Sequence, residues 1–182
     1  MKLVSSNETK LKEFQRILPE MEILKGLDLR EVQGTPEEVI IHKSLEAGKG
    51  TVVEDTILII EGEEVVDIKW KIQELKNLKS YNTIKASWQV LLGYNTGKTI
   101  EIYKGIINGI IVPDSTDKGY GFDPYFLPDG SEVTLAILEK ENTKDNFSAR
   151  RKALINLKTK RKEKVLRTKT IPKWTGKYQN NL

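Results

Sequence analysis

Two adjacent carboxylates, Glu54 and Asp55, follow the strand-like run Thr51–Val53 and precede a second β-branched run at Ile57–Ile60. In α/β folds ligand sites collect at strand ends, where acidic oxygens can hold a divalent metal ion. Phosphoryl chemistry also needs cations for the phosphate oxygens. The chain supplies candidate lysines at Lys10, Lys43, Lys69 and Lys144. The pattern indicates metal-assisted phosphoryl chemistry, with a solvated strand edge as the alternative.

A polar segment lies between the first predicted strand and the first predicted helix. It consists of Ser5, Ser6, Asn7, Glu8, Thr9 and Lys10. Its hydroxyls, backbone N–H groups and lysine can converge on phosphate oxygens at the positive end of the helix, although it lacks the glycines of a P-loop. Glu31 precedes Gly34 in an irregular stretch and is a candidate second metal ligand. An exposed loop glutamate is the alternative for Glu31.

Two later segments could recognise a planar base. In the first, Tyr120, Gly121 and Phe122 place aromatic rings beside a glycine, and Asp123 precedes a proline that favours extended backbone. In the second, Ser148-Ala149-Arg150 offers hydroxyl, backbone and guanidinium donors at the start of a helix. Core packing of the rings and a solvated helix face for Arg150 are the alternatives.

Composition restricts the chemistry. The 182 residues are 38% hydrophobic and 31% charged, which predicts one sizeable core. There is no cysteine and only one histidine, His42, so a metal must be held by oxygen, and oxygen ligands favour Mg²⁺ or Mn²⁺. No apolar run approaches the ~20 residues that span a bilayer. We therefore expect a cytoplasmic protein.

Charge is uneven along the chain. Residues 158–182 carry nine Lys and Arg against the single acid Glu163, which leaves residues 1–157 mildly acidic. We therefore divide the chain into a domain at 1–157 and a basic C-terminal tail at 158–182. A solvated or disordered tail is one hypothesis. Nucleic-acid binding through the tail, with Trp174 and Tyr178 stacking on bases, is another.

The local patterns predict alternating strands and helices. Strands are expected at Lys2–Ser5, Met21–Leu24, Ile84–Leu92, Thr99–Tyr103 and Ile106–Val112, with a hairpin turn at Asn95-Thr96-Gly97. One helix begins after Asn7 and ends before Pro19, and another begins at the capping box of Thr35 and Glu38. Further helices are expected around Ile68–Leu75 and from about Phe147.

Taken in order, these segments resemble the Ham1 family of inosine triphosphate pyrophosphatases. The family's opening signature is a small residue, glycine, asparagine, two variable positions and lysine, which corresponds to Ser5–Lys10 followed by Glu13. Glu31–Glu38 is similar to the segment with the family's metal-binding glutamate, and Val53–Thr56 to its catalytic strand end. Tyr120–Phe126 is similar to its base-binding loop. The likeness extends over about residues 2–157.

The resemblance implies an α/β fold with a long, curved mixed β-sheet, flanking helices and two lobes around a nucleotide cleft. It implies a Mg²⁺-dependent homodimer that hydrolyses ITP, dITP and XTP to the monophosphate and pyrophosphate. Asp55 would be the proton acceptor, and Glu31 and Asp55 the metal ligands. Substrate contacts would come from Ser5, Ser6, Asn7, Glu8, Thr9, Lys10, Lys43, Thr56, Lys69, Tyr120, Gly121, Phe122, Asp123, Lys144 and Arg150.

The chain departs from the family pattern at several positions. Ala149 replaces a histidine that recognises the 6-oxo purine, Ser6 replaces a glycine, and Asp145 replaces an asparagine. The glycine- and proline-rich stretch after the catalytic strand is shortened to Glu61–Glu64. An enzyme of the same fold with altered or relaxed base specificity is therefore the alternative substrate hypothesis.

Overall fold

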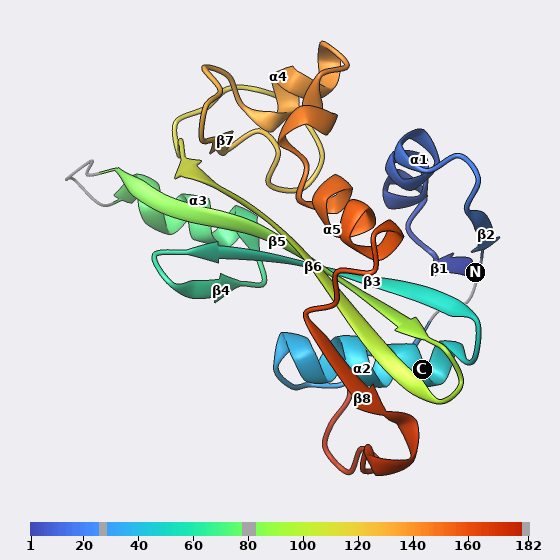
Figure 1. The fold of residues 1–182 in the computed structure, drawn as a ribbon. Coiled ribbons are helices and arrows are strands. Elements are labelled where there is room, and N and C mark those ends of the chain that lie inside the picture. Colours follow the sequence, from blue (N-terminus) through green and yellow to red (C-terminus); the bar gives the residue numbers. More distant parts are fainter. Residues whose placement is uncertain (26–28, 78–82, 180–182) are drawn as a thin grey trace. The chain divides into compact units, whose positions relative to one another are not determined.

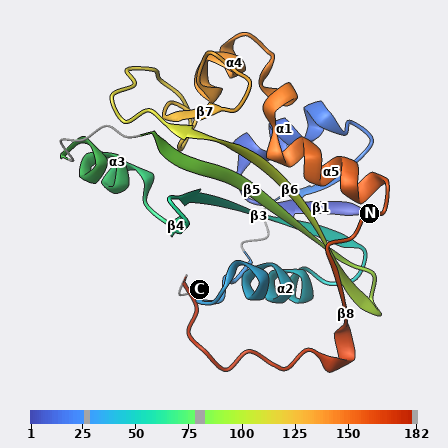
Figure 2. The same cartoon turned by 60° about the vertical axis from the view of Figure 1, so that its left-hand side comes forward.

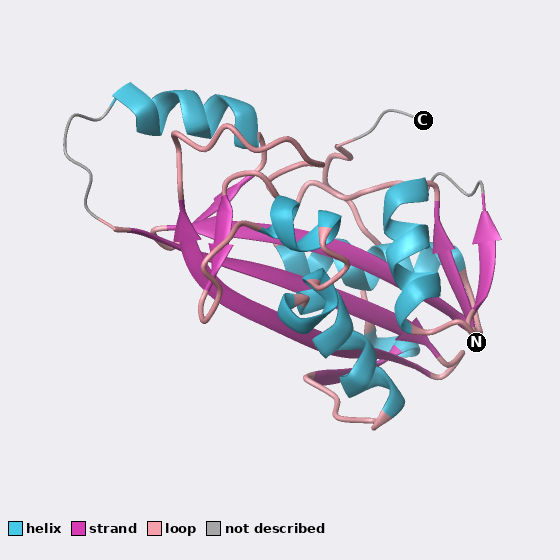
Figure 3. Ribbon diagram, turned by 90° about the horizontal axis from the view of Figure 1, so that it is seen from above, coloured by secondary structure: helices cyan, strands magenta, loops and turns pink. Residues whose placement is uncertain are grey.

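The structure is a computed structural model that describes residues 1–25, 29–77 and 83–179. Figures 1 and 3 show long strands interspersed with helices. The helices are α1 (Glu8–Ile17), α2 (Pro36–Ala47), α3 (Ile68–Asn77), α4 (Leu135–Lys140) and α5 (Ala149–Lys158), with 3-10 turns η1 (Lys144–Phe147) and η2 (Thr168–Thr170). The strands are β1 (Lys2–Ser5), β2 (Glu22–Lys25), β3 (Thr51–Ile60), β4 (Glu63–Val65), β5 (Ile84–Asn95), β6 (Thr99–Ile111), β7 (Phe126–Pro128) and β8 (Lys164–Arg167).

The strands hydrogen-bond in the order β2-β1-β3-β5-β6-β7, with β4 on β3 and β8 on β6. β1 is parallel to β2 and β3, whereas the pairings of β4, β7 and β8 are antiparallel. The predicted mixed α/β fold, a large mixed sheet flanked by helices, is therefore confirmed.

The chain forms two compact units. Unit 1 comprises Met1–Thr56, Val90–Gly105 and Arg150–Leu182, and unit 2 comprises Ile57–Gln89 and Ile106–Ala149. The nucleotide cleft between two lobes stays a prediction.

Local signals explain how the helices of unit 1 begin. The Asn7 side chain accepts a hydrogen bond from the Lys10 N–H and caps α1, and Thr35 and Glu38 form the predicted capping box of α2. Within unit 1, α2 lies on one face of the strands, and α1 and α5 lie on the other (Figures 1 and 2). α2 approaches β5 closely at Gly93, where a Cβ atom would lie 2.0 Å from Ser44 Oγ. Only glycine fits there.

Two of the predicted strand boundaries are wrong. Glu54 and Asp55 do not end a strand, because β3 continues through them from Thr51 to Ile60. β6 likewise runs through Gly105, which we expected to separate two strands. The acidic pair nevertheless lies beside the carboxyl end of β1, since Leu3 pairs with Val52 and β1 ends at Ser5. The strand end that positions the carboxylates is therefore that of β1.

Unit 2 has its own apolar core, which includes the fully buried side chains of Trp88, Phe126 and Leu135. The predicted helix at Ile68–Leu75 is confirmed as α3, with Ile72 and Leu75 buried. β7 and α4 were not predicted. β7 pairs with β6 where Gly109 allows close approach, because a Cβ atom there would lie 2.3 Å from the Leu127 carbonyl oxygen.

The described part of the C-terminal segment pairs with unit 1, although most of its residues are exposed. β8 pairs with β6, and Tyr178 forms an antiparallel bridge with Val32. Arg150–Leu182 belongs to the same compact unit as Met1–Thr56. The division into a domain at 1–157 and a tail at 158–182 stays a prediction. Among the described residues, no helix has the length and apolar character needed to cross a membrane.

Candidate active site

A polar cavity of about 190 Å³ lies within unit 1, where the end of β1 and the start of α1 meet β3. It is lined by Val4, Ser5, Ser6, Asn7, Lys10, Leu29, Glu31, Lys43 and Glu54. Ser5, Ser6, Asn7, Lys10, Lys43 and the predicted metal ligand Glu31 therefore share one cavity, although they come from three separate stretches of sequence. The other predicted metal ligand, Asp55, is not among the lining residues.

The start of α1 lies at this cavity and is fixed by two local hydrogen bonds. Ser5 Oγ accepts the Asn7 N–H at 3.1 Å, and Asn7 Oδ1 accepts the Lys10 N–H at 3.1 Å. These two bonds hold the turn in a shape that presents the helix N-terminus, which favours bound anions. Glu8 and Thr9 were predicted to contact substrate, but both are exposed on the first turn and neither lines the cavity.

Glu54 is the centre of a buried ion-pair cluster. Its carboxylate lies 2.7 Å from Lys10 Nζ and 3.0 Å from Arg150 Nη2, and it accepts a hydrogen bond from the Thr56 hydroxyl. The Glu54 side chain is only 2% exposed, and Arg150 also pairs with Glu13 of α1. Burial alone would raise the pKa of Glu54, but Lys10 and Arg150 outweigh it and hold the pKa well below its usual range. Glu54 is therefore ionised at neutral pH.

Asp55 has a different environment, because successive side chains of a strand point to opposite faces of the sheet. Glu31 and Lys43, which pair at 2.5 Å, both act electrostatically on Asp55. Burial raises the pKa of Asp55 to about 6, with Glu54 and Glu31 adding to the rise and Lys43 and Lys10 opposing it. A carboxyl group with a pKa near neutral pH is suited to act as a general base.

Two members of this cluster were not predicted to have a site role. Glu54 was considered in the acidic pair, but no role was assigned to it, and Glu13 was only part of a motif. Glu13 is 6% exposed and lies three residues after Lys10, so the two share a face of α1. The three-residue spacing between Lys10 and Glu13 was the feature of the sequence that could have placed Glu13 at the site. The partner Arg150 is 137 residues away and could be found only from the fold.

A second cluster of predicted residues lies within unit 2. Lys144 Nζ is 2.5 Å from Asp123 Oδ2, and both residues are buried. The Lys144 ammonium group also lies 5.6 Å from the ring centroid of Trp88, which packs edge-on against Phe122. Trp88 was not predicted. Lys144, Asp123 and Phe122 are thus brought together.

The remaining predicted residues of unit 2 are more exposed, although the Tyr120 carbonyl oxygen accepts the Asp123 N–H at 3.1 Å. Tyr120 is 55% exposed, and Gly121 has φ of 57°, a conformation that favours glycine. Lys69 is exposed in the first turn of α3, where its backbone N–H donates to Asp67. Ala149, the residue at the family's histidine position, is fully buried.

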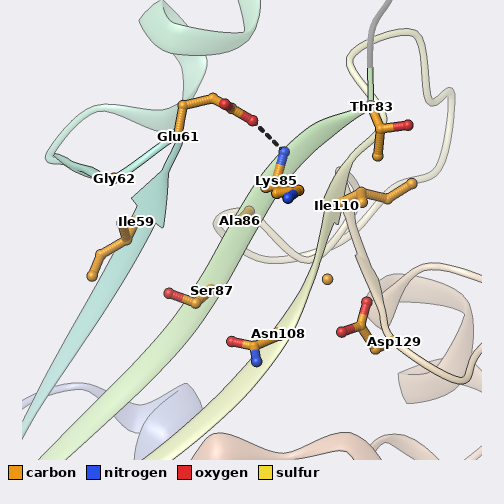
Figure 4. Close-up of a pocket in the computed structure, with 11 residues that line it drawn as sticks. Ile59, Glu61, Gly62, Thr83, Lys85, Ala86, Ser87, Asn108, Ile110 and Asp129 are labelled. Carbon is orange, nitrogen blue, oxygen red and sulfur yellow. Dashed lines mark hydrogen bonds between the residues drawn. The ribbon is translucent and has the colours of Figure 1, made fainter.

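A larger cavity of about 510 Å³ lies within unit 2 and contains none of the predicted site residues. It is lined by residues of β3, β5 and β6 together with Glu61, Gly62, Thr83 and Asp129 (Figure 4). The Glu61 side chain accepts the Lys85 N–H at its rim. Apolar surface predominates in this lining, so it lacks the converging cations that phosphate binding requires.

Fold and site together define an α/β protein with a polar pocket, lined by lysines and carboxylates, at the end of a parallel strand. The description of the matching family model is "Ham1 family", and the match covers residues 1–160. The chain belongs to the Ham1 family, and the resemblance inferred from its motifs is confirmed.

Similar proteins agree with this assignment. An inosine triphosphate pyrophosphatase of Fusarium vanettenii is 37% identical over 177 residues, covering 88% of this chain and 95% of that protein. One of Scheffersomyces stipitis is 32% identical over 183 residues, covering 85% and 94%. The Staphylococcus aureus Ham1 protein structure matches with a TM-score of 0.69 at 24% identity, covering 87% of this chain and 97% of that one. This likeness supports the fold.

Proposed function

We propose that this protein is a Mg²⁺-dependent nucleoside triphosphate pyrophosphatase that removes ITP, dITP and XTP from the nucleotide pool. It cleaves the bond between the α and β phosphates and releases the monophosphate and pyrophosphate. One observation carries the proposal: the polar cavity of unit 1 combines a helix N-terminus, two lysines and two acidic side chains. The names of the related proteins support the same chemistry.

In this proposal the cations and the helix end bind the phosphate chain. Lys43 is 14% exposed and Lys10 is 22% exposed, so each side chain is largely sheltered from bulk water while still lining the cavity. Charge-assisted contacts are stronger in such surroundings than in water. Asp55 accepts a proton from the attacking water, and its pKa of about 6 leaves it mostly ionised at pH 7 to 8.

The carboxylates of the site fit a magnesium ion. Among the described residues no group of three or more His, Asp or Glu side chains could hold a metal ion. Mg²⁺ commonly binds through only one or two carboxylates, together with substrate phosphates and water. Burial and the nearby Glu31 carboxylate both raise the pKa of Asp55, and a divalent cation beside Asp55 would relieve the cost of ionising it. They would hold Mg²⁺, which would neutralise phosphate charge.

A second candidate function is the same reaction with relaxed base specificity. Ala149 is fully buried and offers no side-chain hydrogen bond to a base. Loss of one such bond weakens discrimination by about 1–3 kcal/mol. Comparing kcat/KM for ITP, XTP, GTP and dUTP distinguishes the two. A strong preference for ITP over GTP would reject relaxed specificity.

The decisive test is pyrophosphate release from ITP with and without Mg²⁺. We expect turnover with Mg²⁺, little turnover in excess EDTA, and recovery with Mg²⁺ or Mn²⁺. Absence of pyrophosphate from every nucleotide of the panel would reject the proposal. The assay should also separate pyrophosphate from orthophosphate, since γ-phosphate release would indicate a different hydrolase.

The homodimer and the base contacts of Tyr120, Gly121, Phe122, Asp123 and Lys144 are proposals that rest on the family resemblance. Light scattering of the purified protein tests the dimer. Nucleic-acid binding by the C-terminal segment has less support, because Trp174 packs on His42 and Tyr178 lies under Arg30. An RNA affinity that falls steeply as the salt concentration rises would support nucleic-acid binding by this segment.

A further inference from the structure

The segment that contains Glu31 forms backbone hydrogen bonds with residues near the C-terminus. Residues 29–35 contain no helix or strand apart from the isolated bridge at Val32. The Gln179 N–H donates to the Glu31 carbonyl oxygen at 2.7 Å, and the Gln33 N–H donates to the Lys177 carbonyl oxygen at 2.9 Å. The Gln179 side chain also donates to the Val32 carbonyl oxygen at 3.0 Å. This pairing resembles a short antiparallel strand added beside Glu31.

Aromatic contacts anchor the residues that make these bonds. The ring of Trp174 lies 5.3 Å from the ring of His42 in α2, and its indole N–H donates to the Lys177 carbonyl oxygen at 3.0 Å. The Arg30 guanidinium lies 4.9 Å from the centroid of the Tyr178 ring. A Cβ atom on Gly34 would lie 3.1 Å from the Trp174 ring, so the two segments are in close contact.

The C-terminal partners in these contacts lie outside the part of the chain that the family model matches, which ends at residue 160. Residues 171–179, which we call the C-terminal strap, cross α2 and end beside Glu31. The strap therefore touches both elements whose side chains form the Glu31–Lys43 pair of the candidate active site.

We infer that the C-terminal strap is a positioning element of the active site, which holds the backbone of Glu31 so that its carboxylate is oriented for the metal ion. The inference rests on the proposed function, since that assigns Glu31 to the metal. Groups that orient a metal ligand typically change metal affinity by 10–100-fold when they are removed. Loosening the strap should therefore weaken metal binding while the rest of the fold persists.

The test uses full-length variants with a matched series. Gln179→Pro removes the N–H that donates to Glu31, whereas Gln179→Ala removes only the side-chain bond to Val32. Trp174→Ala removes the aromatic anchor. Lys169→Ala, in an exposed position before the strap, is the control. Each variant is first compared with the parent by thermal melting and circular dichroism.

Two readouts do not depend on turnover. Binding of Mn²⁺ is followed by water proton relaxation, and hydrogen exchange is measured at the Gln33 amide. We expect Mn²⁺ affinity to fall about 10-fold or more in Gln179→Pro and Trp174→Ala, less in Gln179→Ala, and not in Lys169→Ala. The Gln33 amide should exchange faster in the first two. In the turnover assay, the half-saturating Mg²⁺ concentration should rise by a similar factor, while KM for ITP at saturating Mg²⁺ changes little.

The outcomes separate this inference from the proposed function. Unchanged Mn²⁺ affinity in folded Gln179→Pro and Trp174→Ala overturns the inference, whatever happens to exchange at Gln33. Failure of the parent protein to bind Mn²⁺ also overturns it. If the parent binds Mn²⁺ and the variants bind it more weakly, but no nucleotide yields pyrophosphate, the strap inference stands and the proposed reaction fails.

Discussion

Glu54 and Asp55 are neighbours in β3, but their carboxyl groups have opposite electrostatic environments. Lys10 and Arg150 hold the pKa of Glu54 well below its usual range, whereas burial raises the pKa of Asp55 to about 6. The difference follows from the strand, which directs the two side chains to opposite faces. Glu54 is thus a buried anion, whereas Asp55 titrates near pH 6. Neutralising Glu54 should therefore lower the free energy of unfolding, and neutralising Asp55 should raise it.

Neutralising Asp55 should remove activity and stabilise the metal-free protein. Asp55→Asn loses the proposed base and a metal ligand, so we expect kcat/KM to fall at least ~100-fold. The folded pKa of Asp55 lies above its ordinary value of 3.8, so its contribution to stability is present below about pH 4 and is lost as pH rises through about 6. At pH 8 in EDTA, Asp55→Asn should raise the free energy of unfolding by about 1–3 kcal/mol.

Urea denaturation at pH 4.5 and pH 8 measures that change, and the gain should shrink at the lower pH. Asp114→Asn, at an exposed loop position, is the control and should change neither activity nor stability. A loss of stability at pH 8 in Asp55→Asn would contradict the raised pKa, and activity within a few-fold of the parent would contradict the catalytic role.

Neutralising Glu54 should destabilise the protein. Glu54→Gln leaves the buried charges of Lys10 and Arg150 without their shared partner, and such losses cost about 3–5 kcal/mol. Because the folded pKa of Glu54 is lowered, its stabilisation is present above its ordinary value of 4.5 and declines as pH falls. Urea denaturation of both proteins between pH 3 and 8 measures this. A cost that does not diminish at low pH would argue against an ionic role for Glu54.

The buried pair of unit 2 should show strong coupling. Lys144→Met leaves the buried Asp123 carboxylate without its ammonium partner and should cost about 3–5 kcal/mol. The double variant Lys144→Met, Asp123→Leu should recover much of that loss, because both charges are removed. A double-mutant cycle measures the coupling, with Lys140→Met on the exposed side of α4 as the control. Simple additivity would show that the pair is not coupled.

Placing the family's histidine at position 149 should destabilise the protein. Ala149 is fully buried, so Ala149→His adds a large ring to a packed site and should cost about 1–3 kcal/mol or more. Ile155→His, at a position of α5 that is 47% exposed, should cost much less. Thermal melting compares the two. If Ala149→His keeps full stability and increases the preference for ITP over GTP, the surroundings of residue 149 accommodate an imidazole, contrary to this expectation.

The sequence alone determined the features that depend on neighbours within a few residues. The cap at Asn7, the capping box of Thr35 and Glu38, and the turn at Asn95–Gly97 are local hydrogen-bonding patterns, and all of them occur as predicted. The ordered motifs also identified the family, because five short segments in one order are specific even where each is ambiguous.

Tertiary structure decided which charges meet. The sequence suggested that Glu54 and Asp55 act together at a strand end, but continuous pairing of β3 places them in mid-strand and on opposite faces. Arg150 reaches Glu13 and Glu54, and Gln179 reaches Glu31, across most of the chain. Such contacts form only when burial of apolar side chains brings distant segments together, and no pattern of adjacent residues records which distant partner will be there.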